Sequence, residues 1–119
     1  MTDSYLEPKD TRVGQCALEF VQALVDSDFE KAASFIASDV REKYSVDELR
    51  QQYLAMIDYW DTPTVDLIEA LESLDDWPNK QSSDLGWIYV SVEGEGFGEA
   101  VSVVITQDQK IRDIEWGRP

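Results

Sequence analysis

The spacing of hydrophobic residues changes along the chain, and this change constrains the fold more than any other feature. In roughly the first half, apolar side chains recur every three or four positions, which is the period of one helix face. From residue 87 onward they form short runs rich in β-branched and aromatic side chains, which is typical of strands. A chain of 119 residues suits one domain. We therefore expect a single α+β domain over residues 1–119, with residues 1–9 as a short, loosely held arm.

The first two predicted helices follow one another closely. Residues 13–24 form one apolar stripe, and Asp10 or Thr11 can cap the helix that they form. An acidic break follows, and Asp28 can cap a second, shorter helix that runs through Ala37. Cys16 lies on the apolar stripe of the first helix, where we expect it to be an inert core residue.

The third predicted helix has the best local signal in the chain, the tetrapeptide Ser45-Val46-Asp47-Glu48. Its Ser-x-x-Glu spacing lets each of the two side chains bond the backbone N–H of the other at the start of a helix. Apolar side chains continue on one stripe as far as Trp60, and Pro63 stops the helix near Asp61.

Three strands are predicted in the C-terminal part of the chain, over residues 87–92, 97–106 and 111–116. Two short turns between them give an antiparallel meander. Residues 64–74 are ambiguous, because their leucines fit one helix face and local propensity favours a helix. Tertiary context commonly overrides such a propensity, so the local pattern leaves both structures open.

The order of these elements matches a limited set of folds, and three segments narrow that set. They are residues 17–30, ALEFVQALVDSDFE, residues 35–40, FIASDV, and residues 111–117, IRDIEWG. Together they resemble the nuclear transport factor 2-like superfamily, the cone-shaped fold shared by ketosteroid isomerase, scytalone dehydratase and SnoaL-like polyketide cyclases. The resemblance implies that residues 64–74 form a strand. It also implies three N-terminal helices packed on a curved antiparallel sheet of four or more strands, a cystatin-like cone.

The charge of the chain excludes several partners. There are 25 acidic and 10 basic residues, which gives a formal net charge of −15. This field repels phosphate backbones and anionic membranes, so we expect no nucleic-acid partner and no membrane partner. The charge either keeps the protein soluble or steers it toward a basic protein partner. No signal sequence and no membrane-spanning stretch is visible, and we expect a cytoplasmic protein.

The residue types present also limit the chemistry. Histidine is absent and Cys16 is the single cysteine, so we expect no disulfide, no metal site and no cofactor. The isomerases of the superfamily use an Asp base just after the second helix, and the resemblance places Tyr44 at that position. The dehydratases rely on a His–Asp pair. We therefore expect no catalytic residues, although Asp39 and Glu42 remain as nearby carboxylates.

Six aromatic residues form the candidate ligand-binding set: Tyr44, Tyr53, Trp60, Trp87, Tyr89 and Trp116. Aromatic walls with polar tips suit a small apolar ligand between the helices and the sheet. The competing interpretation is that these side chains fill the core and close the cavity.

Three functional hypotheses follow from these observations. The sequence favours a non-catalytic binding module of the nuclear transport factor 2-like type, which binds a small apolar ligand or a protein partner. One alternative is an acidic inhibitor or immunity protein that covers a basic toxin or enzyme. The other is an isomerase-, dehydratase- or cyclase-like enzyme with a carboxylate–tyrosine site.

The strand at residues 87–92 predicts a homodimer through the sheet. Trp87 and Tyr89 lie on one of its faces, and Ile88, Val90 and Val92 lie on the other. Helices can cover only one face of a sheet, and monomers rarely expose large apolar patches. A second copy can bury the other face. If the protein is a monomer, the loop at residues 75–84 is the expected cover.

Overall fold

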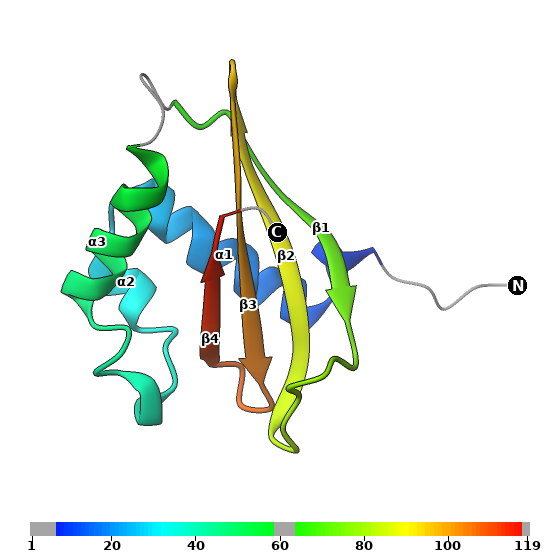
Figure 1. Cartoon of the computed structure of the whole chain (residues 1–119). Helices are drawn as coiled ribbons and strands as arrows, with labels where there is room; N and C mark the ends of the chain where they lie inside the picture. Colours follow the sequence, from blue (N-terminus) through cyan, green and yellow to red (C-terminus); the bar gives the residue numbers. More distant parts are fainter. Residues whose placement is uncertain (1–6, 59–63, 118–119) are drawn as a thin grey trace, which may run out of the picture.

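The computed structural model describes residues 7–58 and 64–117, which form a helical layer and a sheet (Figure 1). The helices are α1 (Arg12–Val25), α2 (Phe29–Ala33) and α3 (Val46–Ile57), with short 3-10 helices η1 (Pro8–Asp10) and η2 (Ser38–Val40). The strands are β1 (Leu67–Leu74), β2 (Asp84–Gly94), β3 (Phe97–Thr106) and β4 (Ile111–Trp116). The strands form one antiparallel sheet in the order β1-β2-β3-β4. The predicted α+β architecture, with helices before strands, is confirmed.

Each of the three helices begins at a capping side chain. The Oγ1 atom of Thr11 accepts a hydrogen bond from the backbone N–H of Gly14 at the start of α1. Asp28 caps α2, and Ser45 caps α3 by accepting from the backbone N–H of Glu48. These side chains satisfy N–H groups that have no partner inside the helix, which is why the sequence located the helix starts correctly.

The segment after α2 differs from its prediction. The helix ends at Ala33 rather than Ala37. The backbone N–H of Ala37 donates instead to the carbonyl of Ile111, and the N–H of Ile111 donates to the carbonyl of Phe35. A short parallel bridge to β4 thus takes the backbone groups that a longer helix would have used.

Two other boundary predictions have different outcomes. Part of the expected loose arm is ordered, because Pro8–Asp10 forms η1 next to the start of α1. The two segments are so close that a Cβ atom on Gly14 would lie 1.7 Å from the Pro8 carbonyl oxygen. The third helix ends at Ile57, with Asp58 as its C-cap, and so before the expected stop near Asp61. Pro63 and Trp60 lie outside the described residues.

The ambiguous segment is a strand. Residues 67–74 form β1, which pairs antiparallel with β2 from Leu67 opposite Glu93 to Leu74 opposite Trp87. The register shifts between Ala70 and Glu72, so Leu71 occupies a bulge. The pairing supplies backbone hydrogen bonds that the isolated segment lacks, and it overrides the local preference for a helix.

The core lies between α1 and the face of the sheet that the helices cover (Figure 1). The side chains that are fully buried include Phe20, Val21 and Leu24 of α1, Ile88, Val90 and Val92 of β2, and Val101 and Ile105 of β3. This face of the sheet is therefore closed by packing, and any surface for a partner has to be sought elsewhere.

A buried ion pair joins the first residue of β2 to β4. The side chain of Asp84 is completely buried, and Arg112 holds it with two hydrogen bonds, of 2.8 Å to Oδ1 and 2.7 Å to Oδ2. The backbone N–H of Gln81 also donates to Asp84, at 2.8 Å. These bonds lower the pKa of the Asp84 carboxyl, with the hydrogen bonds from Arg112 as the largest cause.

Replacing Arg112 tests this ion pair. In Arg112→Met the Asp84 carboxylate stays buried without its ion partner, so the free energy of unfolding at pH 7 should fall by about 3–5 kcal/mol in urea denaturation. The lowered pKa of Asp84 stabilises the wild type above pH 3.8, the ordinary value, and this contribution is lost as the pH falls below it. Arg112→Met should lose less stability over that acidic range.

The double variant Asp84→Leu with Arg112→Met is the control. It removes both charges together, and burying an ion pair carries its own cost of desolvation. We therefore expect it to recover most of the stability that the single variant loses. A double variant as unstable as Arg112→Met would contradict the role of charge compensation.

Candidate functional site

The face of the sheet turned away from the core is called the outer face. Side chains directly opposite one another on antiparallel strands point to the same side, so the strand register arranges this face in four rows. The rows are Leu67 with Glu93 and Gly98; Glu69 with Ser91 and Ala100; Glu72 with Tyr89, Ser102 and Glu115; and Leu74 with Trp87, Val104 and Asp113.

The β1 end of the outer face is apolar and exposed. Leu67, Leu71 and Leu74 have exposed fractions of 48%, 49% and 38%. These three residues are called the leucine row. Large aliphatic side chains gain free energy when they leave water, at about 25 cal/mol for each Å² buried. Three of them on one short strand therefore favour contact with another molecule.

The four strands are strongly acidic. Their acidic residues are Glu69, Glu72, Asp84, Glu93, Glu99, Asp113 and Glu115, and their single basic residue is Arg112. Asp84 is buried and Glu99 lies opposite the core residue Val92, so the other five carboxylates belong to the rows of the outer face. Because Arg112 is paired with Asp84, its charge is compensated within the chain. The outer face consequently presents carboxylates with no unpaired basic side chain of its own strands.

The structure does not bring the six aromatic candidates together. Tyr44 and Tyr53 belong to the buried core, with exposed fractions of 3% and 5%. Trp87 and Tyr89 lie half-buried on the outer face, with their ring centroids 6.4 Å apart. Trp116 lines an open groove of about 440 Å³ beside Met56 of α3. Trp60 lies outside the described residues.

Tyr44, which the resemblance places where a base would stand, acts as a structural link. Its hydroxyl donates to Oδ1 of Asp113 at 2.9 Å and accepts from the backbone N–H of Ile114 at 3.2 Å. Burial raises the pKa of the phenol above its ordinary value of 10, so Tyr44 is protonated at neutral pH. Asp39 and Glu42 are both exposed, and neither is desolvated as a tuned general base would be.

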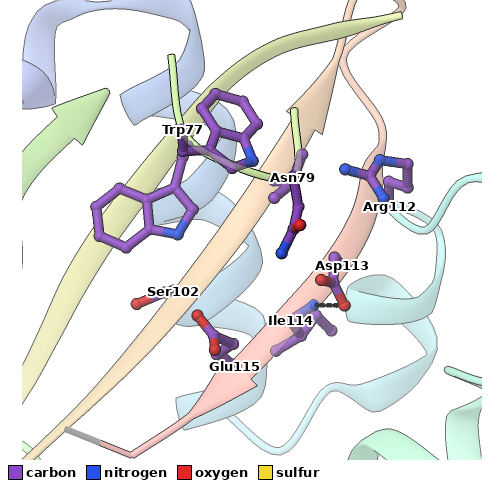
Figure 2. Close-up of a pocket in the computed structure, with 9 residues that line it drawn as sticks. Trp77, Asn79, Ser102, Arg112, Asp113, Ile114 and Glu115 are labelled. Atoms are coloured by element: carbon purple, nitrogen blue, oxygen red, sulfur yellow. Dashed lines mark hydrogen bonds between the residues drawn. The ribbon is translucent and has the colours of Figure 1, made fainter. Parts of the chain in front are cut away.

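A small pocket lies on the outer face beside β4, and we call it the tryptophan–carboxylate pocket (Figure 2). Its volume is about 120 Å³. Its lining residues are Trp77, Asn79, Trp87, Ser102, Val104, Arg112, Asp113, Ile114 and Glu115. Figure 2 shows Asn79 between Trp77 and Asp113, with Ser102 and Glu115 near one another below Trp77. The loop that carries Trp77 and Asn79 thus covers part of the outer face.

Sequence reasoning missed most of this pocket. Residues 75–84 were predicted as a polar loop, yet Trp77 is a large apolar residue among polar ones, and that contrast was the available signal. Asp113 and Glu115 alternate along β4, so their common face was also readable once the strand was predicted. The sequence analysis expected the loop at residues 75–84 to cover this face in a monomer, and the loop does cover part of it, but the approach of Trp77 and Asn79 to β4 was not predicted.

Among the described residues, neither the cysteine nor the acidic side chains form a reactive or metal-binding site. Cys16 is buried, and burial raises the pKa of its thiol to about 11, so the predicted core position is confirmed and the thiol is protonated at neutral pH. Across residues 7–58 and 64–117, no group of three His, Cys, Asp or Glu side chains could hold a metal ion. None of the described helices has the length and apolar character needed to cross a bilayer.

Comparisons with protein-family models, with curated proteins and with solved structures found no match for the chain. Its function is therefore inferred from its own residues and their geometry.

Replacing Tyr44 tests whether its hydroxyl is a structural link. Tyr44→Phe removes the bonds to Asp113 and Ile114, and the free energy of unfolding should fall by about 1 kcal/mol in urea denaturation. Tyr53→Phe is the matched control, because no described residue hydrogen-bonds the hydroxyl of Tyr53, which is buried to a similar extent. Equal losses in the two variants would contradict the link.

Proposed function

We propose that this chain is a non-catalytic binding module whose outer face docks a basic protein partner. The observation that carries the proposal is the leucine row, three exposed apolar side chains on β1, surrounded by strands whose only basic residue is already paired. Burial of the leucines supplies affinity, and the carboxylates around them supply selection for a partner of opposite charge.

The shape of the molecule favours a protein over a small apolar ligand. Tyr44 and Tyr53 fill the space between the helices and the sheet. The tryptophan–carboxylate pocket, at about 120 Å³, is smaller than the roughly 300–1,000 Å³ of sites for drug-sized ligands. The groove beside Trp116 is wide and open rather than enclosing. A broad, exposed surface of mixed apolar and acidic character is better suited to another protein.

The same charges favour a basic partner over a second copy of the chain. Two copies joined through their outer faces would oppose Glu69, Glu72 and Glu93 of one copy to the same acidic surface of the other. Each copy carries a formal charge of −15, and like charges brought together cost free energy. The homodimer predicted from the sequence remains the competing occupant of this face.

The fold supports the resemblance to the nuclear transport factor 2-like superfamily in its order of elements. Helices precede an antiparallel four-stranded meander, and we propose that this sheet is the curved wall of the cystatin-like cone. An inhibitor or immunity protein covering a basic toxin or enzyme would use the same docking chemistry. An isomerase-like role has less support, because Tyr44 is protonated and hydrogen-bonded in place.

Partner binding can be tested with two matched leucine variants. The full chain is used to capture proteins from an extract of its source organism at low salt, and each captured protein is purified and its binding measured. Leu74→Ser on the outer face should weaken binding about 10-fold, because an apolar contact is lost. Leu54→Ser on α3 should leave it unchanged, although Leu54 and Leu74 are both 38% exposed. A partner equally sensitive to both variants would contradict the proposal.

Salt provides a second test on the same partner. Its association rate should fall at least about 10-fold between 20 mM and 150 mM salt, because electrostatic steering is screened. A neutral or acidic partner with a salt-independent rate would overturn the charge argument. So would a homodimer that is stable at micromolar concentration in sedimentation and is broken by Leu74→Ser, which would confirm the second copy as the occupant.

A further inference from the structure

We propose that the tryptophan–carboxylate pocket receives an arginine side chain of the basic partner. This inference rests on the proposed function and adds the chemistry that recognises one partner side chain. The pocket is continuous with the leucine row, because Leu74, Trp87, Val104 and Asp113 lie in one row across the sheet. A partner docked on the leucines therefore reaches the pocket along the same face.

Two indole rings provide the apolar side of the pocket. Trp87 comes from β2 and Trp77 from the loop that precedes it, and both are half-buried. The face of an indole attracts a cation that lies within about 6 Å of the ring centroid. The chain already contains one such contact, since Nζ of Lys80 lies 5.7 Å from the centroid of the Trp77 ring.

Two carboxylates provide the opposite side. Glu115 is exposed at its outer end and forms no hydrogen bond or ion pair with any described residue. Asp113 uses Oδ1 for its bonds to Tyr44 and Ile114, and no described residue bonds its Oδ2. Both carboxylates thus retain oxygens that can accept from a cationic donor (Figure 2).

Ser102 adds a hydroxyl group to the lining of the pocket. It lies between Tyr89 and Glu115 in its row, and its side chain forms no hydrogen bond with residues 7–58 and 64–117. Among these residues no fully buried side-chain oxygen or nitrogen lacks a hydrogen-bond partner, so the Ser102 hydroxyl is accessible from the pocket. It can accept a hydrogen bond from a donor that enters there.

The pocket is negative and selects a flat cation. Arg112 also lines it, but Asp84 compensates that charge, and Glu115 is the carboxylate of the pocket that has no ion partner among the described residues. The other nearby cations are Lys80, which lies over the ring of Trp77, and Lys43. Lys43 approaches Asp113 only to 3.9 Å and is largely exposed. A guanidinium is planar, so it can stack on an indole and donate to carboxylate and hydroxyl oxygens at once, which a lysine ammonium cannot do as well.

A pair of small probes tests the charge requirement. N-acetyl-arginine methylamide is titrated into the ¹⁵N-labelled protein, with the citrulline analogue, its neutral isostere, as the control. The indole N–H signals of Trp77 and Trp87, identified in Trp77→Phe and Trp87→Phe, should shift and saturate with the arginine probe alone. Equal shifts with citrulline, or no shift with either probe, would overturn the proposal.

Two glutamate variants locate the binding site. Glu115→Gln should weaken the arginine probe about 3- to 5-fold, because a partly exposed charge is removed from the pocket. Glu95→Gln makes the same change of net charge at the β2–β3 turn and should leave the affinity unchanged. Ser102→Ala should weaken binding about 3-fold through the loss of one hydrogen bond. Equal effects of Glu115→Gln and Glu95→Gln would assign the binding to net charge and overturn the pocket.

The same variants separate this inference from the proposed docking. If Leu74→Ser weakens the protein partner while Glu115→Gln and the arginine probe have no effect, the docking surface stands and the arginine pocket is overturned. If the arginine probe binds at Glu115 but no basic partner depends on Leu74, the docking proposal fails and the pocket remains a site for a guanidinium cation.

Discussion

A sheet has two faces, and in the described part of this chain the α-helices lie on one of them. This constraint determines where each kind of residue lies. Ile88, Val90 and Val92 are buried against the helices, while Trp87 and Tyr89, which alternate with them on the same strand, face outward. The loop with Trp77 covers only part of the outward side, next to β4. The side chains of the leucine row on β1 are exposed. The surface available to a partner is therefore the part of the sheet that the helices and this loop do not cover.

One ion pair within the sheet compensates the charge of the single basic residue on the strands. Arg112 binds the buried carboxylate of Asp84 through its Nε and Nη2 atoms and thereby links the start of β2 to β4. The remaining carboxylates of the outer face have no basic strand residue to neutralise them. Arg112 therefore stabilises the sheet. Because Asp84 compensates its charge, Arg112 does not neutralise the carboxylates on the surface. A strong negative field and a stable acidic sheet are compatible for this reason.

The sequence predicted the features that depend on neighbouring residues. The caps at Thr11, Asp28 and Ser45 are local hydrogen bonds, and the three C-terminal strands follow their side-chain composition. The features that it missed depend on distant segments. The second helix ends early because Ile111 takes its backbone groups, and the pocket exists because a loop residue, Trp77, reaches the face of β4. The aromatic candidates were identified as a set, but Tyr44 and Tyr53 come from the helical layer and lie in the core, whereas Trp87 and Tyr89 lie on the outer face of β2.

The bulge at Leu71 has a consequence for the dynamics of β1. Leu67 and Leu74 are seven residues apart, a helical spacing, and strict alternation would place them on opposite faces of a strand. The bulge absorbs one residue and returns both to the same face. β1 is thus an edge strand with few buried side chains, and its sequence is also compatible with a helix. Such a segment should open at low free-energy cost, and we expect its amide hydrogens to exchange with solvent faster than those of β2 and β3.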